Sequence, residues 1–283
     1  MKVGIGLPSA VPGAPADVLL EWARRADAGS FSSLGVVDRV LYDSYEPMTT
    51  LAAAAAITMR IGLVTMVVIG PLRNNSLLAK EAATVDALSN GRLTLGVGLG
   101  ARADDYEGAG VPTSSRGDAL TEQLADLRSV WEGQKAGPMR ATGERPRLLV
   151  GGTSDLAFLR VAKYADGYVH GGGPPRTFAT AAGKARTAWA DLGRTGSPSL
   201  WAQAYFALGD SDVVATGRDY MLDYYGFTGP FATRIAEGML SSSQAVAQFV
   251  RGYAEAGCDE LVLLPAVADL EQIDRLQEAL GEA

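Results

Sequence analysis

Residues 147–175 read RLLVGGTSDLAFLRVAKYADGYVHGGGPP, and this stretch decides the fold class of the chain. The apolar run Leu148–Val150 and the run Gly167–Val169 each predict a short buried strand. Between them, apolar residues recur at the spacing of an amphipathic helix. The order strand, glycines, helix, strand, glycines is typical of two consecutive units of a parallel (β/α)8 barrel, at the end where such barrels bind ligands.

Gly151 and Gly152 end the first of these strands, and Thr153 and Ser154 follow where the cap of the next helix is expected. Because glycine has no Cβ, a ligand can approach this backbone closely. The first N–H groups of a helix and its positive end also favour an anion. We therefore predict phosphate binding at Gly151, Gly152 and Thr153, with an ordinary capped turn as the alternative.

His170, the only histidine of the 283-residue chain, follows the second strand and precedes Gly171, Gly172 and Gly173. Side chains at the carboxyl end of a barrel strand reach the ligand site. His170 is therefore a candidate for contact with a cofactor or substrate, and the glycines after it are candidates for the wall of the phosphate site. A hydrogen-bonded residue at a strand end is the alternative role for His170.

The same alternation of strands and helices runs through the rest of the chain. Further strands are predicted at Val3–Leu7, Leu34–Val37, Ile61–Val68, Arg92–Val97, Leu200–Leu208 and Glu260–Leu264. The remaining predictions are a loop at Gly133–Pro146, an irregular excursion after strand four at Ala101–Arg116 and an extension of unit seven at Tyr225–Ser243. Eight alternations predict one α/β domain over residues 1–283, a (β/α)8 TIM barrel.

Composition narrows the possible partners. The net charge is −7 and no more than two basic residues are adjacent, so the basic surface of a nucleic-acid-binding protein is not expected. The apolar stretch Ile61–Leu72 is too short to span a bilayer, and the N-terminal residues do not resemble a signal peptide. We therefore expect a cytoplasmic protein without membrane partners. Cys258, the only cysteine, is predicted to be a buried, unreactive thiol.

The residue inventory excludes several kinds of barrel enzyme. One histidine cannot supply the ligands of a metal-dependent hydrolase, so no metal site is expected. The chain has no Gly-x-Ser-x-Gly motif for a nucleophilic serine, and its glycine runs do not match a dinucleotide-binding fingerprint. What remains is a barrel in which the reactive atoms belong to a bound cofactor and the protein supplies its position.

Charged residues at two other strand ends are candidates for the same site. Asp38 either enters the site or pairs with Arg39 or with another arginine, and Arg73 either enters the site or braces a turn. The acidic cluster in the excursion, Asp104, Asp105 and Glu107, is predicted to be a solvated face, with contact of one carboxylate with the substrate or the ring as the alternative. Four tyrosines are expected either to cover the pocket or to pack in the core: Tyr42, Tyr45, Tyr224 and Tyr225.

Eight segments, in their order and spacing, resemble those of the bacterial-luciferase-like superfamily of flavin- or deazaflavin (F420)-dependent oxidoreductases. They are Gly35–Arg39, Tyr45–Leu51, Arg60–Leu63, Pro71–Asn74, Leu78–Thr84, Leu88–Gly98, Leu149–Ser154 and Ala165–Gly167. The resemblance implies that the ring of FMN or F420 lies in the barrel mouth. It also implies a homodimer, and a bulge in strand three with a non-proline cis peptide bond, here between Met66 and Val67.

The resemblance also assigns site residues. Asp38 would reach the polar edge of the ring, and Thr65 and Met66 would line the ring. The residues assigned to the cofactor are Asp38, Thr65, Met66, Val67, Gly98, Gly151, Gly152, Thr153, Gly171 and Gly172. The catalytic candidates are Asp38, Arg39 and His170.

F420-dependent members often have Asp-His where this chain has Asp38-Arg39. Arginine does not donate a proton at neutral pH, so Arg39 is expected to hold an anionic substrate or the negative charge of a reduced flavin. We predict an oxidoreductase that transfers hydride or activates oxygen at a bound FMN or F420 and acts on a small organic substrate. The alternatives are a barrel glycosidase with paired carboxylates, for which only Asp38 is well placed, and a flavin-binding protein without turnover.

Overall fold

Nine parallel strands form the sheet of the protein, whose computed structural model describes residues 1–133, 137–138, 140 and 142–281. The strands are β1 (Lys2–Gly6), β2 (Ser33–Val36), β3 (Gly62–Thr65), β4 (Val68–Ile69), β5 (Leu93–Gly98), β6 (Arg147–Gly151), β7 (Gly167–His170), β8 (Ser199–Phe206) and β9 (Glu260–Pro265). Strand β1 pairs with β9, and β3 pairs with β5, so the sheet closes on itself.

One position in the barrel is shared by β3 and β4. Val64 of β3 pairs with Thr94 of β5, and Val68 of β4 pairs with Val97 of β5. Four residue steps therefore lie opposite three, and the extra residue makes a bulge in the strand. With β3 and β4 counted as one position, the barrel has eight, which confirms the predicted (β/α)8 fold.

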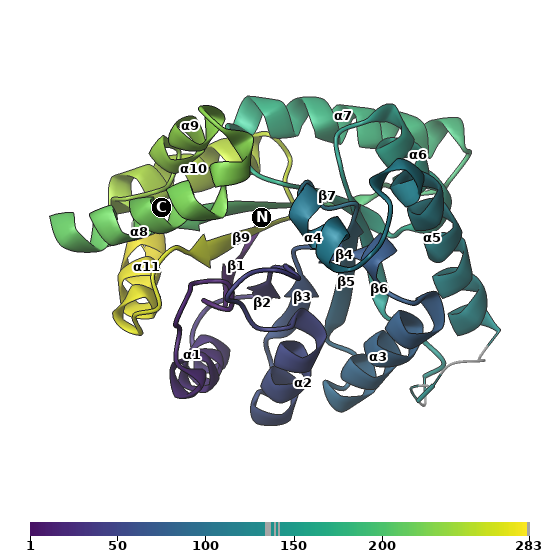
Figure 1. Ribbon diagram of the computed structural model, residues 1–283, viewed down its shortest axis with the longest axis horizontal. Helices are drawn as coiled ribbons and strands as arrows, with labels where there is room; N and C mark the ends of the chain where they lie inside the picture. The colour runs from purple at the N-terminus through teal and green to yellow at the C-terminus, as the bar shows by residue number, and fades with distance from the viewer. Residues whose placement is uncertain (134–136, 139, 141, 282–283) are drawn as a thin grey trace.

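The helices form a ring around the strands (Figure 1). The ring contains α1 (Ala16–Ala28), α2 (Pro47–Ile57), α3 (Asn75–Leu88), α5 (Arg116–Glu132), α6 (Asp155–Tyr164), α7 (Pro175–Asp191), α8 (Ser211–Tyr224), α10 (Ser243–Glu255) and α11 (Glu271–Gly281). Shorter elements are η1 (Gly70–Leu72), α4 (Ala103–Gly108), η2 (Thr113–Ser115), η3 (Gly226–Thr228) and α9 (Phe231–Glu237). Among the described residues, no helix has the length and apolar character needed to cross a membrane.

The segment after β5 corrects one prediction. Residues 101–116 were expected to be irregular, but they contain α4 and η2. The reason is that Tyr106 of α4 is buried and its hydroxyl donates a hydrogen bond to the carbonyl of Leu99, which holds the helix on the barrel. The predicted extension Tyr225–Ser243 contains η3 and α9, and the predicted loop Gly133–Pro146 lies partly outside the described residues.

Apolar side chains pack in two layers. Val64, Val169 and Val262 belong to the cluster inside the barrel, and Trp22 and Trp131 belong to the cluster between the strands and the helices. Cys258 is buried there, and burial raises the pKa of its thiol to about 12. The predicted burial of Cys258 is confirmed, and the raised pKa favours the protonated thiol, which is the less reactive form.

Candidate active site

Two neighbouring cavities open at the carboxyl ends of the strands. The smaller, of about 190 Å³, is lined by strand-end residues that include Asp38 and Met66, and we call it the mouth cavity. The larger, of about 760 Å³, extends from the end of β7 to α8 and α9, and we call it the rim cavity. Gln203, Tyr205 and Tyr225 line both cavities and therefore stand between them.

The bulge between β3 and β4 forms one wall of the mouth cavity. The peptide bond between Met66 and Val67 is cis, as the resemblance implied, and both side chains line the cavity. Thr65 is fully buried, and its hydroxyl donates to the carbonyl of Gly96 at 2.7 Å and accepts from the N–H of Gly96 at 2.8 Å. Thr65 was expected to line the cofactor, but in the structure it fastens the bulge to β5.

Gly98 also packs against the bulge. A Cβ atom added at Gly98 would lie 2.7 Å from Cγ2 of Val67, so a larger residue would collide with the bulge. Gly98 was assigned to the cofactor, but it is not among the residues that line the two cavities. The close approach of β5 to Val67 accounts for a glycine here.

Asp38 is held by groups from the end of the third barrel position. Its side chain is 2% exposed, accepts from the N–H of Ile69 at 2.9 Å and forms an ion pair with Arg73 at 3.0 Å. Burial raises the pKa of the Asp38 carboxyl, and the charge of Arg73 opposes this increase. Arg73 also pairs with Glu46, so it braces the turn, and contact of Asp38 with a ring stays a prediction.

Arg39 is neutralised by the acidic residues of α4. Its Nε donates to Asp105 at 2.7 Å and its Nη2 donates to Asp104 at 2.9 Å. Asp105 is fully buried and also accepts from the N–H groups of Val40 and Leu41. Asp105 is therefore not part of a solvated face, and Arg39 is not a free cation for a substrate. The sequence signal was that Arg39 and the segment that contains Asp105 each follow a strand, so both lie on the rim at the carboxyl ends of the strands.

His170 lines the rim cavity and is buried with 5% exposure. Its Nδ1 accepts a hydrogen bond from the N–H of Gly172 at 3.2 Å, and its ring meets Phe178 edge to face. Burial lowers the pKa of the imidazole, so the neutral form is favoured. An imidazole that accepts at Nδ1 carries its proton on Nε2.

The glycines after β7 form an open backbone wall of the rim cavity. A Cβ added at Gly171 would meet no atom within 4 Å, whereas Gly172 and Gly173 have φ values of +107°, which favour glycine. Thr153 lines the same cavity, but Gly151 and Gly152 do not. Gly152, with φ of +129°, serves the turn into α6, which Ser154 caps by accepting from the N–H of Ala157.

Four tyrosine rings fill much of the mouth: Tyr224 and Tyr225 were expected to cover the pocket or to pack, whereas Tyr205 and Tyr220 were not singled out. Tyr205, Tyr220, Tyr224 and Tyr225 pack with ring centroids 5.1–6.3 Å apart. This packing leaves the mouth cavity below the range of about 300–1,000 Å³ that is typical of small-molecule sites, and the rim cavity lies within it. Tyr205 was missed because an inward position on β8 can be recognised only once the barrel register is known.

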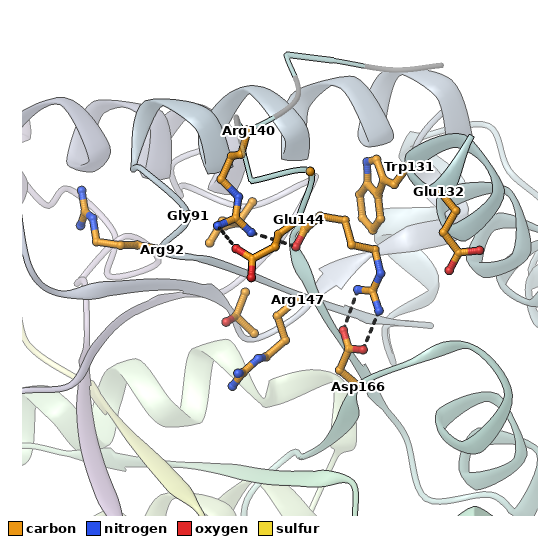
Figure 2. A pocket seen from close by; sticks show the side chains of 12 residues that line it. Gly91, Arg92, Trp131, Glu132, Arg140, Glu144, Arg147 and Asp166 are labelled. Carbon is orange, nitrogen blue, oxygen red and sulfur yellow. Dashed lines mark hydrogen bonds and ion pairs between the residues drawn. The ribbon is translucent and has the colours of Figure 1, made fainter. Parts of the chain in front are cut away.

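A third cavity, of about 650 Å³, lies at the opposite end of the barrel beside the first residues of β5 and β6 (Figure 2). Arg145 forms an ion pair with Asp166 at 2.6 Å. Arg140 pairs with Asp86 at 2.8 Å and with Glu144 at 3.0 Å. Arg140 and Arg145 therefore already have carboxylate partners, whereas Arg92 donates to backbone carbonyls and Arg147 is exposed to water.

A sequence model of the family described as luciferase-like monooxygenase matches residues 1–262. An uncharacterised protein of Mycobacterium tuberculosis is 32% identical over 187 residues, which cover 54% of this chain and only 65% of that relative. The oxygenase component of the flavin-dependent trigonelline monooxygenase of Acinetobacter baylyi is 30% identical over 122 residues, or 41% of this chain and 34% of that protein.

Solved structures share the fold. An F420-dependent secondary alcohol dehydrogenase in complex with an F420-acetone adduct has a TM-score of 0.82 at 17% identity, over 98% of this chain and 97% of that one. The oxygenating constituent of 3,6-diketocamphane monooxygenase from Pseudomonas putida, in complex with FMN, has a TM-score of 0.77 at 16% identity, over 99% and 95%. At these identities the similarity shows the barrel fold.

Proposed function

The chain belongs to the luciferase-like monooxygenase family, and from this premise we propose that it is an oxidoreductase that binds FMN or F420 at the carboxyl end of its barrel. Its substrate is a small organic molecule. The observation that carries the proposal is the rim cavity, whose wall at the end of β7 is the bare backbone of Gly171, Gly172 and Gly173. Such a wall admits a ligand up to the main chain.

The residues of the rim cavity suit the anionic tail that both cofactors carry. Arg234 of α9 lines the cavity and has no ion-pair partner among the residues that the structure describes. The hydroxyl of Thr153 makes no hydrogen bond within the same residues. Thr153, Gly171 and Arg234 would hold the phosphate, because an arginine and a hydroxyl donate to phosphate oxygens.

The chain itself would supply position and exclude water. When bound, the cofactor supplies hydride transfer or oxygen activation. Met66 and Val67 present an apolar surface to the mouth cavity, and the tyrosines beside it keep water out. Asp38 and Asp105 hold strand ends through Arg73 and Arg39. Because both carboxylates are already paired, the structure does not favour a glycosidase with two free acids.

Cofactor uptake tests the proposal. The purified protein is incubated separately with FMN and with F420, passed through a desalting column and examined by visible spectroscopy. We expect one of the two to remain bound, and Arg234→Gln to lose affinity for it by about tenfold. Retention of neither cofactor refutes the proposal. Uptake without reduction by any donor would instead support a cofactor-binding protein without turnover.

The remaining predictions about the whole protein are also proposals. We propose one domain over residues 1–283, since the first and last strands, β1 and β9, pair with each other. We propose a homodimer in the cytoplasm, without nucleic-acid or membrane partners. Exposed apolar side chains such as Leu156 and Leu159 of α6 are consistent with a subunit contact. Light scattering coupled to size-exclusion chromatography measures the assembly, and a monomeric mass contradicts the dimer.

A further inference from the structure

Arg102 is a buried arginine that has no carboxylate partner in the part of the chain that the structure describes. It precedes α4, is 6% exposed and lines the mouth cavity. Its guanidinium lies 4.1 Å from the ring centre of Tyr224 and 4.4 Å from that of Phe227, so two aromatic rings lie close to it. Its Nη2 donates to the carbonyl of Tyr224. Within the described residues, no carboxylate lies within ion-pair distance of Arg102.

The charges around the mouth cavity leave Arg102 uncompensated. Asp38 is paired with Arg73, and Asp105 is paired with Arg39. Burial raises the pKa values of Tyr224 and Tyr225, so these neighbours are neutral hydroxyls at pH 7. A buried charge is costly unless it is paired, and an anion from outside the chain would remove this cost.

Two donor atoms of Arg102 are available for such an anion. Nε and Nη1 make no hydrogen bond among the described residues. Neither atom is among the fully buried polar atoms that lack a partner, so both remain accessible. Nε and Nη1 lie on different edges of the guanidinium, and each can donate a charge-assisted hydrogen bond to a carboxylate oxygen. The aromatic rings of Tyr205, Tyr224 and Tyr225 on the cavity wall suit a flat apolar body next to that group.

We propose that the mouth cavity binds the carboxylate of a small, flat substrate against Arg102. This inference names the substrate class and rests on the proposed function. The volume of about 190 Å³ limits the group to about one ring with a carboxylate. Benzoate is the probe for this chemistry, and benzamide is its neutral counterpart of the same shape.

Isothermal titration calorimetry on the cofactor-free protein measures both probes. We expect benzoate to bind at least about tenfold more tightly than benzamide, and Arg102→Gln to remove this preference. Arg147→Gln is the matched control, because Arg147 lines the cavity at the opposite end of the barrel, and it should bind benzoate as the wild type does. Equal binding of the two probes by the wild type, or an unchanged preference in Arg102→Gln, overturns the proposal.

Two further measurements keep the test decisive. Arg102→Lys keeps the positive charge, so it should still bind benzoate more tightly than benzamide, with a smaller difference than the wild type. If Arg102→Gln does not fold, Arg102→Lys replaces it, and loss of the preference for benzoate in Arg102→Lys contradicts the proposal. Titration of benzoate in the presence of bound FMN or F420 identifies the source of the anion. Unchanged or tighter binding supports a substrate site, and competitive displacement shows that Arg102 serves the cofactor. Failure to bind either cofactor refutes the proposed function and leaves the benzoate result standing.

Discussion

The arginines at the two ends of the barrel differ in their partners and in their burial. At the end shown in Figure 2, Arg140 and Arg145 are paired with carboxylates of the chain and Arg92 donates to backbone carbonyls. Arg147 lines the same cavity without an ion-pair partner among the described residues, but it is exposed to water. At the carboxyl end, Arg39 and Arg73 are paired in the same way, but Arg102 and Arg234 line cavities without an acidic partner among the described residues. Each end therefore has an arginine that lines a cavity without an acidic partner among the described residues. Arg147 is exposed to water, whereas Arg102 is buried, so an anion that enters its cavity would compensate its charge. This contrast agrees with the division of barrels into a stabilising end and a functional end.

The largest expected effect tests whether the carboxyl end also contains structural pairs. Asp105→Ala leaves Arg39 buried without its main partner and leaves the N–H groups of Val40 and Leu41 without an acceptor. We expect the free energy of unfolding to fall by about 3–5 kcal/mol, as measured by urea denaturation. A loss below about 1 kcal/mol would show that Arg39 finds another partner and does not depend on the carboxylate of Asp105 in α4.

The matched change at the opposite end is Asp166→Ala. Asp166 is more exposed than Asp105, and its partners Arg145 and Arg128 are also reached by water. We expect the free energy of unfolding to fall by about 1–2 kcal/mol in the same urea measurement. Part of this loss comes from the hydrogen bond that the N–H of Leu148 donates to Asp166. A loss equal to that of Asp105→Ala would show that the difference in burial between the two carboxylates does not determine how much each one stabilises the fold.

A smaller effect separates binding from stability at the rim cavity. Gly171→Ala adds a methyl group where no protein atom lies within 4 Å, so the melting temperature should stay within about 2 °C of the wild type. The same methyl group reduces the space for a ligand at the backbone, and we expect cofactor affinity to fall by about threefold or more. Gly183→Ala is the control, since Gly183 also has free space but lies in α7 away from the cavities. Unchanged affinity in Gly171→Ala would exclude close approach of the cofactor at this glycine.

The smallest effect concerns pH. Burial lowers the pKa of His170 in the folded protein below its value of 6.5 in the unfolded chain. The unfolded state therefore binds more protons below about pH 6.5, and stability decreases as the pH falls through that value. Urea denaturation at pH 7.5 and 5.5 should show a larger loss for the wild type than for His170→Asn, which does not titrate. Equal losses would mean that His170 is accessible to protons in the folded state.

Local patterns predicted the fold and some of the residues that line the cavities, because the relevant signals are short. Alternating strands and helices predicted the barrel, and the resemblance placed the bulge at Met66 and Val67, where the structure has it. The glycines after His170 do line a cavity. Thr65 was assigned to the cofactor by the resemblance and Gly98 was listed with it, but a match of sequence segments does not show which way a side chain points.

The sequence by itself determined the order of the elements and the residue types at the strand ends, since both depend on neighbours a few positions apart. Only the tertiary structure decided which charges meet. Asp38 pairs with Arg73, 35 residues away, and Arg39 pairs with Asp105, 66 residues away. These pairings depend on the barrel register and on the packing of α4, which bring distant strand ends onto one rim. Among the residues that the structure describes, the same register leaves Arg102 without a carboxylate, because Asp38 and Asp105 are already bound to other arginines.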